Sequence, residues 1–262
     1  EYYCQQALAL ARSLGDLVRQ ATALHIMGWE HNGLERSIAY WEEAIPLYRE
    51  VGNWRYLANC LGRVGLYLVW DGNVDTAQKY LDESSLLYRQ LSIHTDQRQL
   101  FSAYGHLALM RGDYEEARAY FQENARVAKE LGNRLDYLWS NTRIGCAELR
   151  EGNLTEARRV FVETAQEFMK DRYTIGLVFI LECMASLCFA VGKAENAAQL
   201  IGWTDRTREE IGNMRPALEQ ADVDRDIAAV VTRIGKAAFK EAYHLGRGMT
   251  LDEAVTCAIG EE

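Results

Sequence analysis

Apolar residues recur along this chain at the three- and four-residue spacing of an amphipathic helix. Leu57, Leu61, Val64 and Leu68 mark one such stretch. A half-buried strand would instead alternate apolar and polar positions, and no such alternation is sustained here. The chain also contains only two prolines, so long helices meet few breaks. The pattern predicts an all-α fold.

This helical pattern repeats every forty residues. Gly72, Gly112, Gly152 and Gly192 lie forty apart, and Asn32 fills the same slot one period earlier. Glycine followed by Asn or Asp ends a helix and permits a tight turn into the next one. Three further columns keep the same register: a small one (Ser37, Ala77, Ala117, Ala157, Ala197), a large one (Trp41, Leu81, Phe121, Phe161, Ile201) and a second turn (Gly52, Ser92, Gly132, Arg172, Gly212).

Each repeat is therefore expected to be an antiparallel helical hairpin, with a first helix A and a second helix B. The small column lets the two backbones approach, and the large column fills the groove between them. We expect a solenoid over 1–212 that begins with an orphan B-type helix at 1–14. Five hairpins then follow, at about 16–51, 52–91, 92–131, 132–171 and 172–212.

The last fifty residues leave this period. Pro216 starts a new helix, and Thr250 and Glu253 have the spacing of a capping box before a short helix over 251–259. A solenoid needs an atypical end unit to cover its last apolar face. Residues 213–262 are therefore predicted to be C-terminal capping helices.

The repeats resemble the tetratricopeptide repeat (TPR). Residues 64–65 read VG, residues 104–105 read YG and residues 144–145 read IG, each followed seven residues later by Gly and Asn or Asp. The stretch 112–117, GDYEEA, is the most typical. The period is forty rather than about 34, and the family's late proline is missing, so the resemblance is to a long variant. It implies a right-handed superhelical solenoid whose A helices line a concave groove.

The same resemblance assigns groove positions at fixed offsets before the slot that closes each A helix. Large aromatic side chains alternating with polar ones would suit a protein or peptide segment, or a small-molecule effector. The aromatic residues could equally pack between neighbouring repeats, and both interpretations remain open. The candidate groove residues are Arg19, Trp29, Asn59, Trp70, Gln99, His106, Met110, Trp139, Arg150, Phe179, Glu182 and Phe189.

The C-terminal stretch carries a second resemblance. Residues 235–239, GKAAF, and 246–255, GRGMTLDEAV, are similar to the extreme C-termini of large bacterial LuxR-type regulators of the maltose-activator kind. Those proteins are signal-transduction ATPases, and their repeat region acts as a sensor arm. The resemblance implies a sensing or protein-interaction domain of such a regulator. The alternative is a free-standing TPR scaffold that assembles a protein complex.

Composition and charge narrow the function further. The net charge of −9 disfavours direct nucleic-acid binding, which needs clustered Lys and Arg. No apolar run is long enough to span a membrane, and a cytoplasmic location is expected. Neither a phosphate-binding glycine loop nor a nucleophile or zinc motif occurs, so we expect no cofactor, no metal and no enzymatic activity. The six cysteines show no metal-ligand spacing and are expected to be reduced.

The first residue is Glu1, and it enters directly into a helical pattern. We therefore expect this chain to be a piece of a longer protein. An orphan first helix would expose apolar surface, so a homodimer through the N-terminal end is a further expectation.

Overall fold

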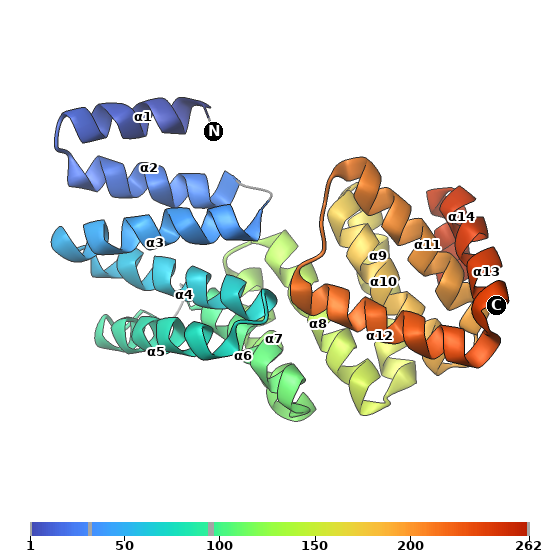
Figure 1. Cartoon of the computed structure of the whole chain (residues 1–262). Helices are drawn as coiled ribbons and strands as arrows, with labels where there is room; N and C mark the ends of the chain where they lie inside the picture. Colours follow the sequence, from blue (N-terminus) through green and yellow to red (C-terminus); the bar gives the residue numbers. More distant parts are fainter. Residues whose placement is uncertain (1, 31–32, 94–96, 261–262) are drawn as a thin grey trace. The chain divides into compact units, whose positions relative to one another are not determined.

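The computed structural model describes residues 2–30, 33–93 and 97–260, and within these ranges every regular element is a helix. Consecutive helices pack against one another in pairs, so the predicted all-α helical repeat is confirmed. The chain divides into two compact units, Glu1–Leu107 and Ala108–Glu262. Figure 1 shows the helices in chain order. The slot residue Asn32 lies outside the described residues.

Unit 1 consists of one single helix followed by helical hairpins. The single helix is α1, which packs on α2, and α2 pairs with α3 as α4 does with α5. The helices of this unit are α1 (Tyr2–Ser13), α2 (Leu17–Glu30), α3 (Leu34–Glu50), α4 (Trp54–Trp70), α5 (Val74–Gln90) and most of α6 (Arg98–Arg111).

Unit 2 continues the hairpins and adds three helices beyond them. Its members are the end of α6, then α7 (Tyr114–Glu130), α8 (Arg134–Glu151), α9 (Leu154–Lys170), α10 (Thr174–Ala190), α11 (Ala194–Ile211), α12 (Ala217–Ile234), α13 (Lys236–Gly248) and α14 (Leu251–Ile259).

The turn residues occupy the predicted slots. The glycines that close both the A and the B helices have positive φ, for example 83° at Gly72 and 66° at Gly132. Two slots hold other residues in the same left-handed conformation, Ser92 with φ 54° and Arg172 with φ 51°. The left-handed backbone conformation of the turns therefore recurs every forty residues, even at the two positions where glycine is absent.

The small and large columns form the interior of the hairpins. Trp41, Leu81 and Phe161 are fully buried. Phe161 lies against Gly145 of the preceding helix so closely that a Cβ on that glycine would meet the ring at 2.5 Å. The A-helix glycine therefore makes room for the large B-helix side chain, which explains why both columns recur.

After α11 the chain departs from the hairpin pattern. The backbones of α11 and α13 approach so closely that a Cβ on Gly202 or Gly246 would overlap a carbonyl of the other helix. The predicted capping box is confirmed, since Thr250 Oγ1 accepts from the Glu253 N–H at 3.3 Å and Thr250 N–H donates to Glu253 Oε2 at 2.7 Å. The helices α12 and α13 each bury two residues, Val223 and Val230 in α12 and Ala242 and Gly246 in α13.

Candidate functional site

The twelve candidate groove residues differ widely in exposure. Arg19, Trp29 and Met110 are exposed, whereas Gln99, His106, Phe179 and Glu182 are buried. The buried residues can shape a surface but present little area to a partner. The remaining five, Asn59, Trp70, Trp139, Arg150 and Phe189, are half-buried. Whether any of the twelve binds a partner stays a prediction.

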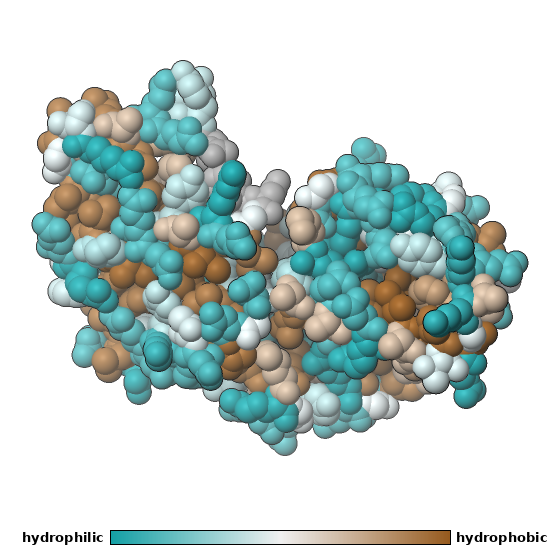
Figure 2. All heavy atoms as spheres, viewed as in Figure 1, coloured by the Kyte–Doolittle hydropathy of each residue, from teal (hydrophilic) through white to brown (hydrophobic). Residues whose placement is uncertain are grey.

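The α2 helix of unit 1 carries an apolar stripe on its exposed side. Val18, Thr22, Ile26 and Trp29 follow one another at helical spacing, so they share one face. Trp29 is 53% exposed, Ile26 42% and Val18 51%. We call these four residues the α2 stripe. In Figure 2, which shows one face of the molecule, apolar patches are interrupted by hydrophilic residues in both units.

An arginine from the neighbouring A helix supports the end of this stripe. The guanidinium carbon of Arg63, on α4, lies 3.1 Å from the centroid of the Trp29 ring. Its Nε donates to Asn59 Oδ1 at 3.1 Å, so two candidate residues hold one cation between them. Burial lowers the pKa of Arg63 to about 9, because the charged form loses hydration. The cation–π contact fixes the orientation of the exposed indole.

Aromatic rings continue from Trp29 into the interior of unit 1. His25 meets the Tyr56 ring edge-on at 5.5 Å, and its Nδ1 lies 3.2 Å from Cys60 Sγ. Burial, with a smaller contribution from Arg63, lowers the pKa of His25 to about 4, so the ring is neutral at physiological pH. The α2 stripe is thus backed by a packed aromatic layer.

Trp70 and His106 form a second aromatic pair in unit 1, with ring centroids 6.1 Å apart and planes nearly perpendicular. Trp70 also lies 5.0 Å from Tyr67. These contacts favour packing between repeats, one of the two roles that the sequence left open. The buried Nε1 of Trp70 has no hydrogen-bond partner within the described part of the chain.

In unit 2, the helix α12 covers the predicted groove side of the A helices α8 and α10. Figure 1 shows α12 crossing these helices. Arg150 of α8 is ion-paired with Asp222, and Ser186 of α10 donates a hydrogen bond to Asp226. Both carboxylates belong to one face of α12. Arg150, one of the twelve candidate groove residues, therefore already holds an intramolecular partner.

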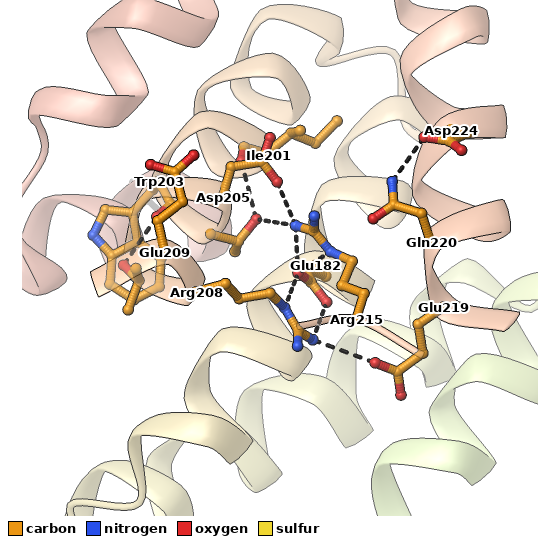
Figure 3. A network of polar contacts seen from close by, with 12 residues as sticks. Glu182, Ile201, Trp203, Asp205, Arg208, Glu209, Arg215, Glu219, Gln220 and Asp224 are labelled. Atoms are coloured by element: carbon orange, nitrogen blue, oxygen red, sulfur yellow. Dashed lines mark hydrogen bonds and ion pairs between the residues drawn. The ribbon is translucent and has the colours of Figure 1, made fainter. Parts of the chain in front are cut away.

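A buried network of ion pairs anchors the start of α12. Glu182 of α10 accepts hydrogen bonds from Nε and Nη2 of Arg208, at 2.8 Å each, and from Nε of Arg215 at 2.8 Å (Figure 3). Arg215 also forms an ion pair with Asp205 at 2.5 Å, and Arg208 forms one with Glu219 at 3.3 Å.

Glu219 closes the network by accepting from Arg143 of α8 at 2.8 Å. Three guanidinium groups thus face three carboxylates, which compensates the cost of burying them. Glu182, a groove candidate by sequence, is the central acceptor of this network. The network ties α8, α10, α11 and α12 together.

Trp139 and Phe179, two aromatic candidates of unit 2, pack against each other between successive hairpins. Trp139 contacts Phe168 at 5.8 Å and Phe179 at 5.3 Å between ring centroids. Phe179 also carries the Arg143 guanidinium 4.2 Å above its ring. In this unit too, the aromatic residues fill the space between repeats.

Sequence reasoning missed Arg63, which supports Trp29, and the arginines that surround Glu182. The available signal was a charged residue inside an apolar helical stretch, as in LGRVGLYLVW over 61–70. A lone arginine in such a stretch must find a compensating neighbour when buried.

The described residues hold neither a cluster of metal ligands nor a helix that could cross a membrane. Within residues 2–30, 33–93 and 97–260, no three His, Cys, Asp or Glu side chains gather as a metal site. Over the same ranges, the helices are too short or too polar to cross a bilayer.

These features define a helical-repeat domain whose A helix α2 carries an exposed stripe. Residues 96–166 match the family model of the tetratricopeptide repeat. Together with the helical pairs on both sides, the match supports a TPR domain, a fold that generally serves protein interaction without catalysis. No curated protein matches the chain.

Proposed function

We propose that this chain is a non-enzymatic interaction scaffold that binds a protein or peptide segment on the α2 stripe. The observation that carries the proposal is the exposure of Val18, Ile26 and Trp29 on a single helical face of the first hairpin. Exposed apolar surface with polar neighbours is typical of interaction sites. Aromatic anchors contribute a large share of binding energy at such sites.

The groups beside the stripe indicate what kind of partner would fit it. Asn59 is half-buried beside the stripe and offers an amide, while Trp29 offers a ring held by Arg63. A segment with apolar side chains at helical or extended spacing, and backbone groups free to bond with the amide, would fit this surface.

The experiment is a selection of binders from a random-peptide display library on the purified chain. The affinity of selected peptides is then measured for wild type, Ile26→Ser and Trp29→Ala. We expect each substitution to weaken binding tenfold or more. Leu86→Ser is the matched control, because Leu86 is 48% exposed on the B helix α5, and it should bind like wild type. Selected peptides that bind both α2 variants as tightly as they bind wild type would contradict the proposal.

The wider context is proposed on the resemblance of residues 235–239 and 246–255 alone. There the chain is the sensor arm of a bacterial transcriptional regulator or signalling ATPase, located in the cytoplasm. A free-standing scaffold fits the same fold equally well. The two are separated by the gene around this sequence, in which a regulator encodes a P-loop module and a helix-turn-helix domain.

A further inference from the structure

Two cysteine thiols from neighbouring A helices of unit 2 lie side by side. The Sγ atoms of Cys146 on α8 and Cys183 on α10 are 3.4 Å apart. A disulfide requires about 2.0 Å, so the two sulfurs need to approach by only about 1.4 Å. The other buried thiols have different neighbours: Cys60 contacts His25, and Cys188 contacts the Ala258 carbonyl.

The two thiols differ in their surroundings. Cys146 is half-buried, whereas Cys183 is buried. The hydrogen bond from Cys183, together with the cations of Arg143 and Arg150, holds the pKa of Cys146 below its usual range, although burial opposes this. Burial raises the pKa of Cys183, which therefore stays protonated. Cys146 thus has the lower pKa of the two and a partly exposed side chain, and Cys183 is a buried thiol in contact with it.

We propose that Cys146 and Cys183 form a reversible redox pair, in which a peroxide oxidises Cys146 and Cys183 then closes a disulfide between α8 and α10. The Cys146 thiolate attacks hydrogen peroxide, so an S–O bond forms, the O–O bond breaks and hydroxide leaves as water after taking a proton. The Cys183 sulfur then attacks the sulfenic acid. The S–S bond forms, the S–O bond breaks, and the proton of Cys183 leaves with the hydroxyl as a second water.

The site lies where α12 meets α8. Arg143, one turn before Cys146, pairs with Glu219 of α12, and Arg150, one turn after it, pairs with Asp222. Oxidation would fix the spacing of α8 and α10 and remove the thiolate that faces these arginines. The disulfide would therefore join two successive hairpins beneath the contacts that hold α12.

The test oxidises the reduced 262-residue chain with hydrogen peroxide at pH 7, blocks remaining thiols with N-ethylmaleimide and maps tryptic peptides without reductant. We expect peptide 144–150 joined to peptide 173–193 with the loss of two hydrogens, reversed by dithiothreitol. Fragmentation must place the bond at Cys183, because the longer peptide also holds Cys188. Cys146 found only as sulfinic acid, left alkylated, or joined to another cysteine overturns the proposal.

Matched variants sharpen the test. Cys183→Ser should abolish the disulfide and let Cys146 proceed to sulfinic acid, whereas Cys188→Ser should form the same disulfide as wild type. Arg143→Gln should move the pH midpoint of the peroxide reaction upward, because the thiolate loses a neighbouring cation. An unchanged pH profile would overturn the assignment of Cys146 as the charge-assisted thiolate. Oxidised wild type should also melt about 5 °C or more above the reduced form.

Discussion

The two units use the same kind of helical hairpin to produce surfaces of different character. In unit 1 the A helix α2 leaves Ile26 and Trp29 exposed, and the nearby charge of Arg63 is held by aromatic rings and an amide. In unit 2 the A helices α8 and α10 are crossed by α12, and their charges are paired: Arg143 of α8 with Glu219, and Glu182 of α10 with Arg208. The comparison teaches that a repeat position does not define a binding surface until the tertiary neighbours of that position are known.

The largest expected effect on stability comes from removing the negative charge of Glu182, the central carboxylate of the buried network in unit 2. Glu182→Gln leaves Arg208 and Arg215 buried without their shared negative partner, and we expect a loss of about 3–5 kcal/mol in the free energy of unfolding. Hydrogen exchange followed by mass spectrometry should show lost protection in α10–α12 and unchanged protection in α2–α4.

Glu167→Gln is the control, because its pairs with Arg134 and Lys170 lie at the surface and should contribute little. If Glu182→Gln cost no more than this control, the network would not be what holds α12 in place.

The second effect belongs to unit 1 and depends on pH. The pKa of His25 is about 4 in the folded state and about 6.5 when unfolded, so the unfolded chain binds the extra proton between these values. The free energy of unfolding should therefore fall by up to about 3 kcal/mol as the pH drops from 6.5 to 4.

Denaturant unfolding of wild type and His25→Gln across this range checks the prediction. The variant should show a shallower dependence on pH, whatever its stability at pH 7. Equal slopes would mean that His25 is not buried in its neutral form.

A smaller effect distinguishes backbone geometry from packing in both units. Ser92 in unit 1 and Arg172 in unit 2 hold positive φ values at slots where glycine is otherwise found. Replacing either with glycine should stabilise the chain by about 0.5–1 kcal/mol, because glycine adopts this conformation without steric cost. Thermal unfolding of Ser92→Gly, Arg172→Gly and the double variant measures the gain, which should be additive. A loss of stability in either variant would show that the side chain contributes more than the strain costs.

The smallest effect tests how firmly the middle of α12 is attached. Asp222→Asn removes the partner of Arg150 at a partly exposed position, so we expect a loss of no more than about 1 kcal/mol. Hydrogen exchange should rise in α12 while α13, whose backbone contacts α11 directly, stays protected. Asp224→Asn is a suitable control on the same helix, because Asp224 is exposed and accepts a local hydrogen bond from Gln220. Equal exchange in the two variants would count against a role for the Arg150 pair.

Much of the fold could be predicted from the sequence because the information is local. Helical spacing, the forty-residue columns and the capping box at Thr250 each depend on residues within one or two turns, and the structure confirms them. The candidate site was predicted less completely. The offsets placed Trp29 and Arg19 at exposed positions, yet they also selected Glu182 and His106, which are buried.

What the sequence determined by itself was the succession of helices and turns, since those follow from neighbouring residues. The tertiary structure alone decided which A-helix faces stay open. The pair Arg143–Glu219 joins residues 76 apart, and Cys146 meets Cys183 across 37 positions. Such contacts depend on how distant helices pack against one another. The position of α12 in particular could not be predicted from the repeat pattern, because α12 has no counterpart in the preceding hairpins.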